Sequence, residues 1–76
     1  MTTKQEVGAE SSYTDIAHHI CELGGPKSFR LLVPAIEYYR RVDSWTELKA
    51  ELDAATQEGG KLQMTHYGKY AIAPQS

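Results

Sequence analysis

The sequence lacks several features that would point to a particular compartment or chemistry. Cys21 is the only cysteine in 76 residues, so an internal disulfide and a cysteine-rich zinc site are excluded. A lone cysteine suits a reducing compartment. The longest strongly apolar run, residues 31–33, is far too short to cross a bilayer, and residues 1–12 hold no apolar run of the signal-peptide kind. We therefore expect a cytoplasmic protein without a membrane partner.

Catalytic and metal-binding motifs are missing as well. The sequence contains no serine–histidine–aspartate spacing and no paired carboxylates, and residues 24–28 lack the full pattern of a phosphate-binding loop. His18 and Glu22 share a helix face, but no third ligand is fixed, so a solvated polar face is the simpler interpretation. Cys21 falls at the edge of an apolar stripe, which favours a half-buried, inert thiol. The sequence predicts no enzyme, no metal and no cofactor.

The composition is that of one small globular domain. Hydrophobic residues make up 41% of the chain and charged residues 24%, both ordinary for a folded protein. Residues 1–11 show no periodicity and are predicted to form a disordered tail, which leaves residues 12–74 as a single domain. The net charge of −2 argues against a general polyanion binder, so local charge patches become the question.

Two of three expected helices precede residue 42. Apolar residues at helical spacing predict a helix over residues 13–23, with Ser12 as its N-cap and glycines after it. A second stripe predicts a helix over residues 28–41, with Pro34 on its outward face. Pro34 either kinks one continuous helix, or begins a new helix after a short turn or strand that ends at Val33.

The third expected helix spans residues 45–57. Ser44 and Glu47 form a capping box, the sharpest local signal in the chain. Lys49 and Asp53 can pair across one turn of this helix. The side chains expected to face inward are Trp45, Leu48, Leu52 and Ala55.

A β-hairpin is predicted to follow, with strands over residues 61–65 and 69–73. A two-residue loop would mix apolar and polar side chains on each face, whereas a three-residue loop at 66–68 pairs Met64 with Tyr70 and Leu62 with Ile72. The three-residue loop also places Gly68 at the left-handed position that such loops require.

These elements define an α+β fold: a three-helix bundle containing a helix-turn-helix, followed by a β-hairpin. The second and third helices are expected to be joined by a tight turn at residues 42–44. This order resembles the winged-helix architecture, in which the third helix enters the major groove of DNA and the hairpin forms the wing. The resemblance is to an architecture, which does not by itself determine a function.

The resemblance makes double-stranded DNA the first candidate partner of a small regulatory domain. Residues 61–73 carry Lys61, His66 and Lys69 without an acid, whereas the third helix is acidic, with carboxylates concentrated on one flank, which would weaken phosphate binding. Its outward stripe holds residue types that can contact base edges. The predicted DNA-contacting residues are Thr46, Lys49, Ala50, Gln57, Lys61, His66 and Lys69.

The alternative is a protein-binding module, such as a small inhibitor or adaptor of the kind encoded by phages or mobile elements, that uses the exposed face of the second or the third helix. Residues 27–41 hold four basic residues against one acid, and the outward face of the second helix combines arginine and tyrosine, both enriched at binding hot spots. The predicted partner-binding residues are Arg30, Leu31, Tyr38 and Arg41.

Overall fold

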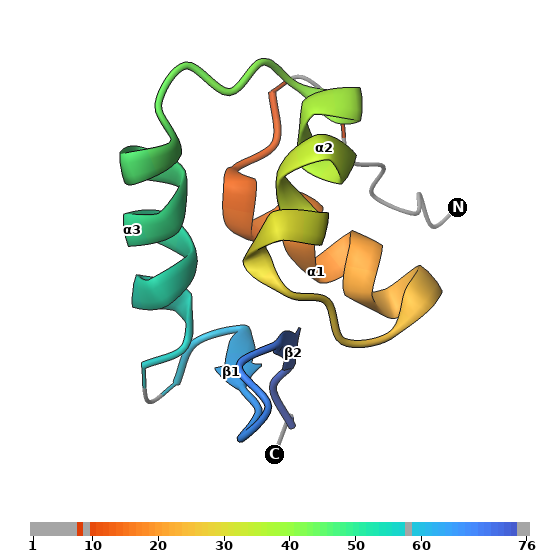
Figure 1. Ribbon diagram of the computed structural model, residues 1–76, viewed down its shortest axis with the longest axis vertical. Coiled ribbons are helices and arrows are strands. Elements are labelled where there is room, and N and C mark those ends of the chain that lie inside the picture. Colours follow the sequence, from red (N-terminus) through yellow and green to blue (C-terminus); the bar gives the residue numbers. More distant parts are fainter. Residues whose placement is uncertain (1–7, 9, 58, 75–76) are drawn as a thin grey trace, which may run out of the picture.

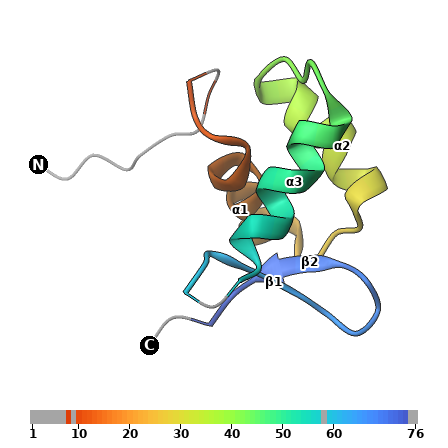
Figure 2. The ribbon, with the colours of Figure 1, turned by 90° about the vertical axis from the view of Figure 1, so that its left-hand side faces the viewer.

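The computed structural model describes residues 8, 10–57 and 59–74. Three helices, α1 (Tyr13–Gly24), α2 (Phe29–Tyr39) and α3 (Trp45–Ala55), precede the two antiparallel strands β1 (Leu62–Met64) and β2 (Tyr70–Ile72). Helix α1 packs against α2, α3 and β2, and the hairpin lies at one end of the three helices (Figures 1 and 2). The α+β composition predicted from the sequence is confirmed.

Local sequence signals account for where α1 and α3 begin. The Ser12 hydroxyl accepts a hydrogen bond from the Asp15 N–H (3.1 Å), and Gly25 ends α1 with a φ of 84°. The Ser44 hydroxyl likewise accepts from the Glu47 N–H (3.3 Å) at the start of α3. Both serines satisfy backbone donors that a helix leaves unpaired at its first turn.

Helix α2 is one continuous helix with Pro34 inside it, so the alternative with a new helix starting at Pro34 is wrong. Pro34 is exposed, and the buried residues of α2, which include Leu32 and Ile36, keep their phase on either side of it. The segment that connects α1 to α2 does pair with the hairpin. The pairing is at Lys27, whose backbone forms two hydrogen bonds with Tyr70 of β2, of 2.7 and 2.9 Å.

The connection between α2 and α3 is longer than the predicted three-residue turn. Helix α2 ends at Tyr39, and residues 40–44 lead to Trp45. Arg40 is extended (φ −153°, ψ 154°); its guanidinium donates to the Ser11 carbonyl (2.8 Å) and lies over the Tyr13 ring. These contacts with the segment before α1 and with its first residue stop α2 early. Most of the predicted disordered tail, residues 1–7 and 9, lies outside the described residues.

The predicted hairpin register is confirmed. Met64 faces Tyr70 and Leu62 faces Ile72, and Gly68 has a φ of 81°. The regular strands are shorter than predicted, although the Thr65 N–H still donates to the Lys69 carbonyl (2.8 Å).

The core lies between the three helices and the hairpin. It includes Ile16 of α1, Leu32 and Ile36 of α2, Leu48 and Leu52 of α3, and Leu62 and Tyr70 of the hairpin, each at most 1% exposed. No helix within the described ranges is long and apolar enough to cross a membrane.

Trp45, which the sequence predicts to face inward, is 60% exposed, and Leu23, at the end of the apolar-spaced residues 13–23, is 74% exposed. Trp45 is the first residue of α3, where its ring packs edge-on against Phe29 at 6.4 Å rather than entering the core. Leu23 lies in the last turn of α1. Helical spacing assigns a face, but it does not show where along the helix the core ends.

Candidate functional site

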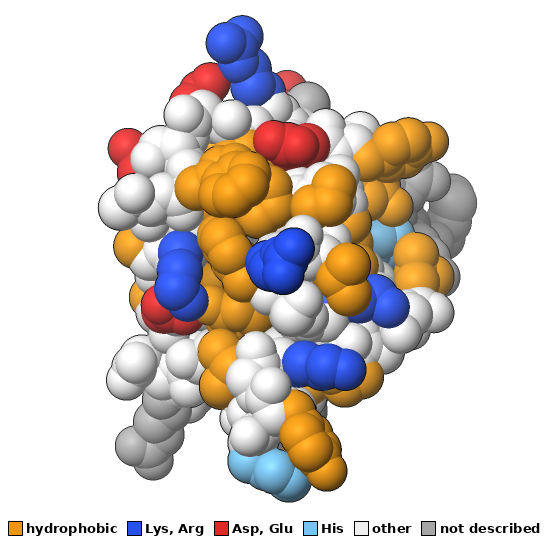
Figure 3. All heavy atoms as spheres, viewed as in Figure 1, with side chains coloured by type: hydrophobic (Ala, Val, Ile, Leu, Met, Phe, Trp, Pro, Cys, Tyr) orange, Lys and Arg blue, Asp and Glu red, His pale blue; other side chains and the backbone are white. Residues whose placement is uncertain are grey.

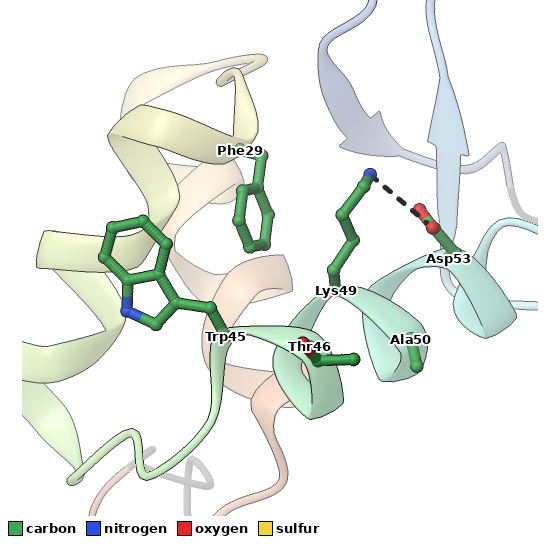
Figure 4. Close-up of a pocket in the computed structure, with 6 residues that line it drawn as sticks. All are labelled: Phe29, Trp45, Thr46, Lys49, Ala50 and Asp53. Atoms are coloured by element: carbon green, nitrogen blue, oxygen red, sulfur yellow. Dashed lines mark ion pairs between the residues drawn. The ribbon is translucent and has the colours of Figure 1, made fainter.

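A shallow, open hollow lies on the surface where the start of α2 meets α3. It is lined by Phe29 of α2 and by five residues of α3: Trp45, Thr46, Lys49, Ala50 and Asp53. In Figure 4, Phe29 and Trp45 lie at one end of the hollow, and Lys49 and Asp53 lie toward the hairpin. The hollow therefore contains three of the predicted DNA-contacting residues, Thr46, Lys49 and Ala50, all of which are exposed.

Two acids of α3 are engaged within the molecule. Glu51 is partly buried, and its carboxylate accepts from the N–H and the hydroxyl of Thr14 (3.0 and 3.3 Å), where α1 begins. A carboxylate at that position caps backbone donors and offsets the positive end of the helix dipole. Asp53 accepts from the Tyr70 hydroxyl (2.5 Å). Glu47 remains exposed in the first turn of α3, and Glu58 lies outside the described residues.

Lys49, Asp53 and Tyr70 form a connected cluster between α3 and β2. The Lys49 ammonium lies 3.5 Å from the Asp53 carboxylate, which confirms the predicted pair, and donates to the Tyr70 hydroxyl at 3.3 Å. The hydrogen bond with Tyr70 raises the pKa of Lys49, so the ammonium is charged at neutral pH. Burial raises the pKa of Tyr70, and its bond to Asp53 adds to this, so the hydroxyl keeps its proton.

The hairpin loop projects away from the helices. His66, Tyr67 and Lys69 are all exposed, Tyr67 at 79%, and the His66 and Tyr67 rings lie 4.3 Å apart. Figure 2 shows α3 in front, with the hairpin beneath it and its loop extending past one side of the helix. The hairpin thus presents aromatic side chains in its loop and the cation of Lys69 just after it.

Lys61 lies away from the other predicted DNA-contacting lysines. Its ammonium lies 2.6 Å from the Asp15 carboxylate of α1, and it lines a second shallow hollow with Glu51 and Ala54, on the α1 flank of α3. Lys49 lies on the opposite flank, so the structure separates two lysines that sequence reasoning had grouped. The Lys61 hydrogen bond lowers the pKa of Asp15. Gln57 is exposed in the turn that follows α3.

The predicted partner-binding face of α2 is a solvent-exposed surface. Leu31 is 58% exposed and Tyr38 is 84% exposed, while Arg41, just beyond the helix, pairs with Asp43 at 2.9 Å. Arg30 is exposed beside Leu31. In Figure 3, hydrophobic side chains cover much of the face shared by α2 and α3, and Lys and Arg side chains lie among them.

The Phe29–Trp45 pair is the part of this surface that sequence reasoning missed. The sequence predicts that Trp45 faces inward, and Phe29 is only partly buried. The available signal was the position of each residue, because both are the first residue of their helix. A first-turn side chain extends beyond its helix and need not enter the core.

Cys21 and His19 of α1 are held by contacts within the molecule. Cys21 is 4% exposed, more deeply buried than predicted, and its thiol donates to the Tyr70 carbonyl (3.5 Å). Burial raises the pKa of the Cys21 thiol, which disfavours the nucleophilic thiolate. His19 packs edge-on against Tyr39. Among the residues that the structure describes, no group of three or more histidine, cysteine or acidic side chains could hold a metal ion.

Comparison with protein-family models, with curated proteins and with solved structures gives no match to this chain.

Proposed function

We propose that the chain is a small non-enzymatic regulatory domain of the winged-helix type, which binds double-stranded DNA through the outer face of α3 and the hairpin. The order of elements and the backbone bridge from Lys27 to β2 support the winged-helix assignment. In that architecture the third helix enters the major groove, and the hairpin touches the adjacent backbone.

The observation that carries the proposal is where the acids of α3 point. Glu51 is committed to the start of α1, and Asp53 is committed to Tyr70 and Lys49. The exposed Thr46 and Ala50 therefore lie beside one carboxylate that is already paired, that of Asp53, and beside one that stays exposed, that of Glu47. The pairing of Asp53 with Lys49 removes part of the electrostatic penalty that the acidic sequence of α3 implied for phosphate approach, and Glu47 keeps the rest.

In this proposal, α3 would contact base edges and the hairpin would contact phosphates. Thr46 and Ala50 are small enough to let the helix approach base edges, and both suit contacts to a thymine methyl group. Lys69 and His66 on the hairpin would contact phosphates, which position the domain without reading sequence. Lys61 would contribute less, because phosphate must compete with Asp15 for its ammonium.

A charge-scanning experiment at Ala50 tests this assignment. Ala50→Lys and Ala50→Glu place opposite charges at one exposed helical position, and both residues favour helices. Measured by fluorescence anisotropy with a random-sequence duplex, the lysine variant should bind several-fold more tightly and the glutamate variant several-fold more weakly. A new phosphate contact should also steepen the salt dependence of log K by about 0.9.

Leu23 provides the matched control. It is 74% exposed in the last turn of α1, and that end of α1 lies on the side of the molecule away from α3 (Figure 1), so Leu23→Lys and Leu23→Glu should alter affinity much less. Equal effects at Ala50 and Leu23 would indicate a response to net charge alone and would contradict binding through the face that contains Ala50.

The second candidate function is protein binding through α2 and the start of α3. The specific observation is the exposure of Leu31, Tyr38 and Trp45 on neighbouring helices, because large apolar and aromatic side chains are typical of binding hot spots. For this function, Tyr38→Ala and Arg41→Ala should each cost about 1 kcal/mol or more of partner affinity, whereas Lys69→Ala should have little effect.

A further inference from the structure

Tyr70 connects the hairpin to three other parts of the molecule. Its backbone N–H and carbonyl pair with Lys27, between α1 and α2, and the same carbonyl accepts from the Cys21 thiol of α1. Its hydroxyl reaches α3, where it donates to Asp53 and accepts from Lys49. The residue is 1% exposed overall, so the ring is fixed by packing while its hydroxyl reaches the surface of α3.

The side-chain bond adds a directional contact between the hairpin and α3. A two-stranded hairpin is marginally stable by itself and depends on what it packs against. The backbone pairing with Lys27 holds β2 along one edge, and Leu62 of β1 is buried in the same core as residues of α3, but neither of these contacts is a hydrogen bond between the hairpin and α3. The bond from the Tyr70 hydroxyl to Asp53 connects these two elements directly. A hydrogen bond to a charged acceptor is about twice as strong as a neutral one.

We propose that Asp53 and Tyr70 are positioning residues, which hold the hairpin at a fixed angle to α3 and so set the spacing between the two halves of the DNA-binding surface. The hydrogen bond between Tyr70 and Asp53, called the Tyr70–Asp53 tie below, follows from the contacts above. Its effect on DNA binding rests on the proposed function. Asp53, an acid on the outward stripe of a helix proposed to bind DNA, is thereby explained as a structural acceptor.

Tyr70→Phe is the direct test, because it removes the hydroxyl and leaves the buried ring. Amide hydrogen exchange followed by NMR reports on the hairpin through the N–H groups of Thr65 and Ala73, both of which donate across the hairpin. The Ile20 N–H in α1 reports on the rest of the domain. Loss of the tie should speed exchange at Thr65 and Ala73 about tenfold, with a smaller change at Ile20.

Asp53→Asn and Asp53→Ala separate positioning from general stability. The asparagine oxygen can still accept from the Tyr70 hydroxyl, so Asp53→Asn should keep hairpin exchange within about threefold of the wild type, whereas Asp53→Ala should match Tyr70→Phe. The proposal is overturned if Tyr70→Phe leaves hairpin exchange unchanged, or if it speeds all three amides by the same factor, which would indicate a global loss of stability.

DNA binding by the same variants tests the second half of the proposal. Tyr70→Phe should weaken duplex binding several-fold without changing its salt dependence, because no cation is removed. Wild-type affinity in a variant with a loosened hairpin would contradict the link between angle and binding. A wild-type chain that binds no duplex would instead remove the proposed function, and hydrogen exchange would still decide whether the tie exists.

Discussion

Replacing Leu48 by alanine tests the central packing of the domain. Leu48 is fully buried where α3 meets the core. The substitution removes three carbon atoms, which corresponds to about 2 kcal/mol of lost transfer free energy. Adding the cavity left behind brings the expected cost to about 2–5 kcal/mol. A 76-residue domain has a total stability of about 4–11 kcal/mol, so this loss is a large share of the whole.

Urea unfolding followed by circular dichroism measures this cost, and Leu23→Ala provides the control. Leu23 undergoes the same chemical change while 74% exposed, so its free energy of unfolding should stay within about 0.5 kcal/mol of the wild type. With a slope near 1 kcal/mol per molar urea for a domain this small, Leu48→Ala should lower the midpoint by about 2 M or more. Equal midpoints for the two variants would refute the assignment of the inward face of α3.

Three further predictions follow from exposed groups. Trp45→Ala should change the free energy of unfolding by less than about 1 kcal/mol in a thermal melt, because Trp45 lies outside the core; a larger loss would show that its contact with Phe29 is structural. Lys61→Ala should return the lowered pKa of Asp15 toward its usual value near 4 in an NMR titration. Because the folded-state pKa is lowered, the stability from this pair, below about 1 kcal/mol, is present above about pH 5 and lost as pH falls through the folded pKa; acid sensitivity unchanged in Lys61→Ala would contradict this. Lys69→Ala should weaken duplex binding for all sequences and reduce the salt slope by about 0.9.

Features set by neighbouring residues could be predicted from the sequence. Ser12 and Ser44 cap their helices as expected, because each serine hydroxyl accepts a hydrogen bond from a backbone N–H only three residues further along the chain. The hairpin register followed from the alternation of apolar residues together with the need for Gly68 in a left-handed conformation. In both cases the competing arrangements differ within a few residues of chain.

Features set by distant residues could not be predicted in this way. Helix α2 ends early because Arg40 reaches Ser11 and Tyr13, about thirty positions away in the sequence. The hydrogen bond that Asp53 accepts from Tyr70 and the ion pair of Lys61 with Asp15 also join residues far apart in the sequence. The charge layout of the candidate surface is therefore a property of the tertiary structure, and charge counts along the chain gave only its overall sign.

Binding of the wild-type chain to duplex DNA tests the proposed function most directly. The measurement is a fluorescence anisotropy titration of a labelled random-sequence duplex, repeated from about 25 to 200 mM salt, where the non-specific phosphate contribution falls steeply. The account predicts binding at the lowest salt and a linear fall of log K with log salt, with a slope of about −2 to −4 for a few phosphate contacts. The absence of binding at the lowest salt, at protein concentrations up to about 100 μM, would contradict the account, because non-specific binding is strongest under that condition.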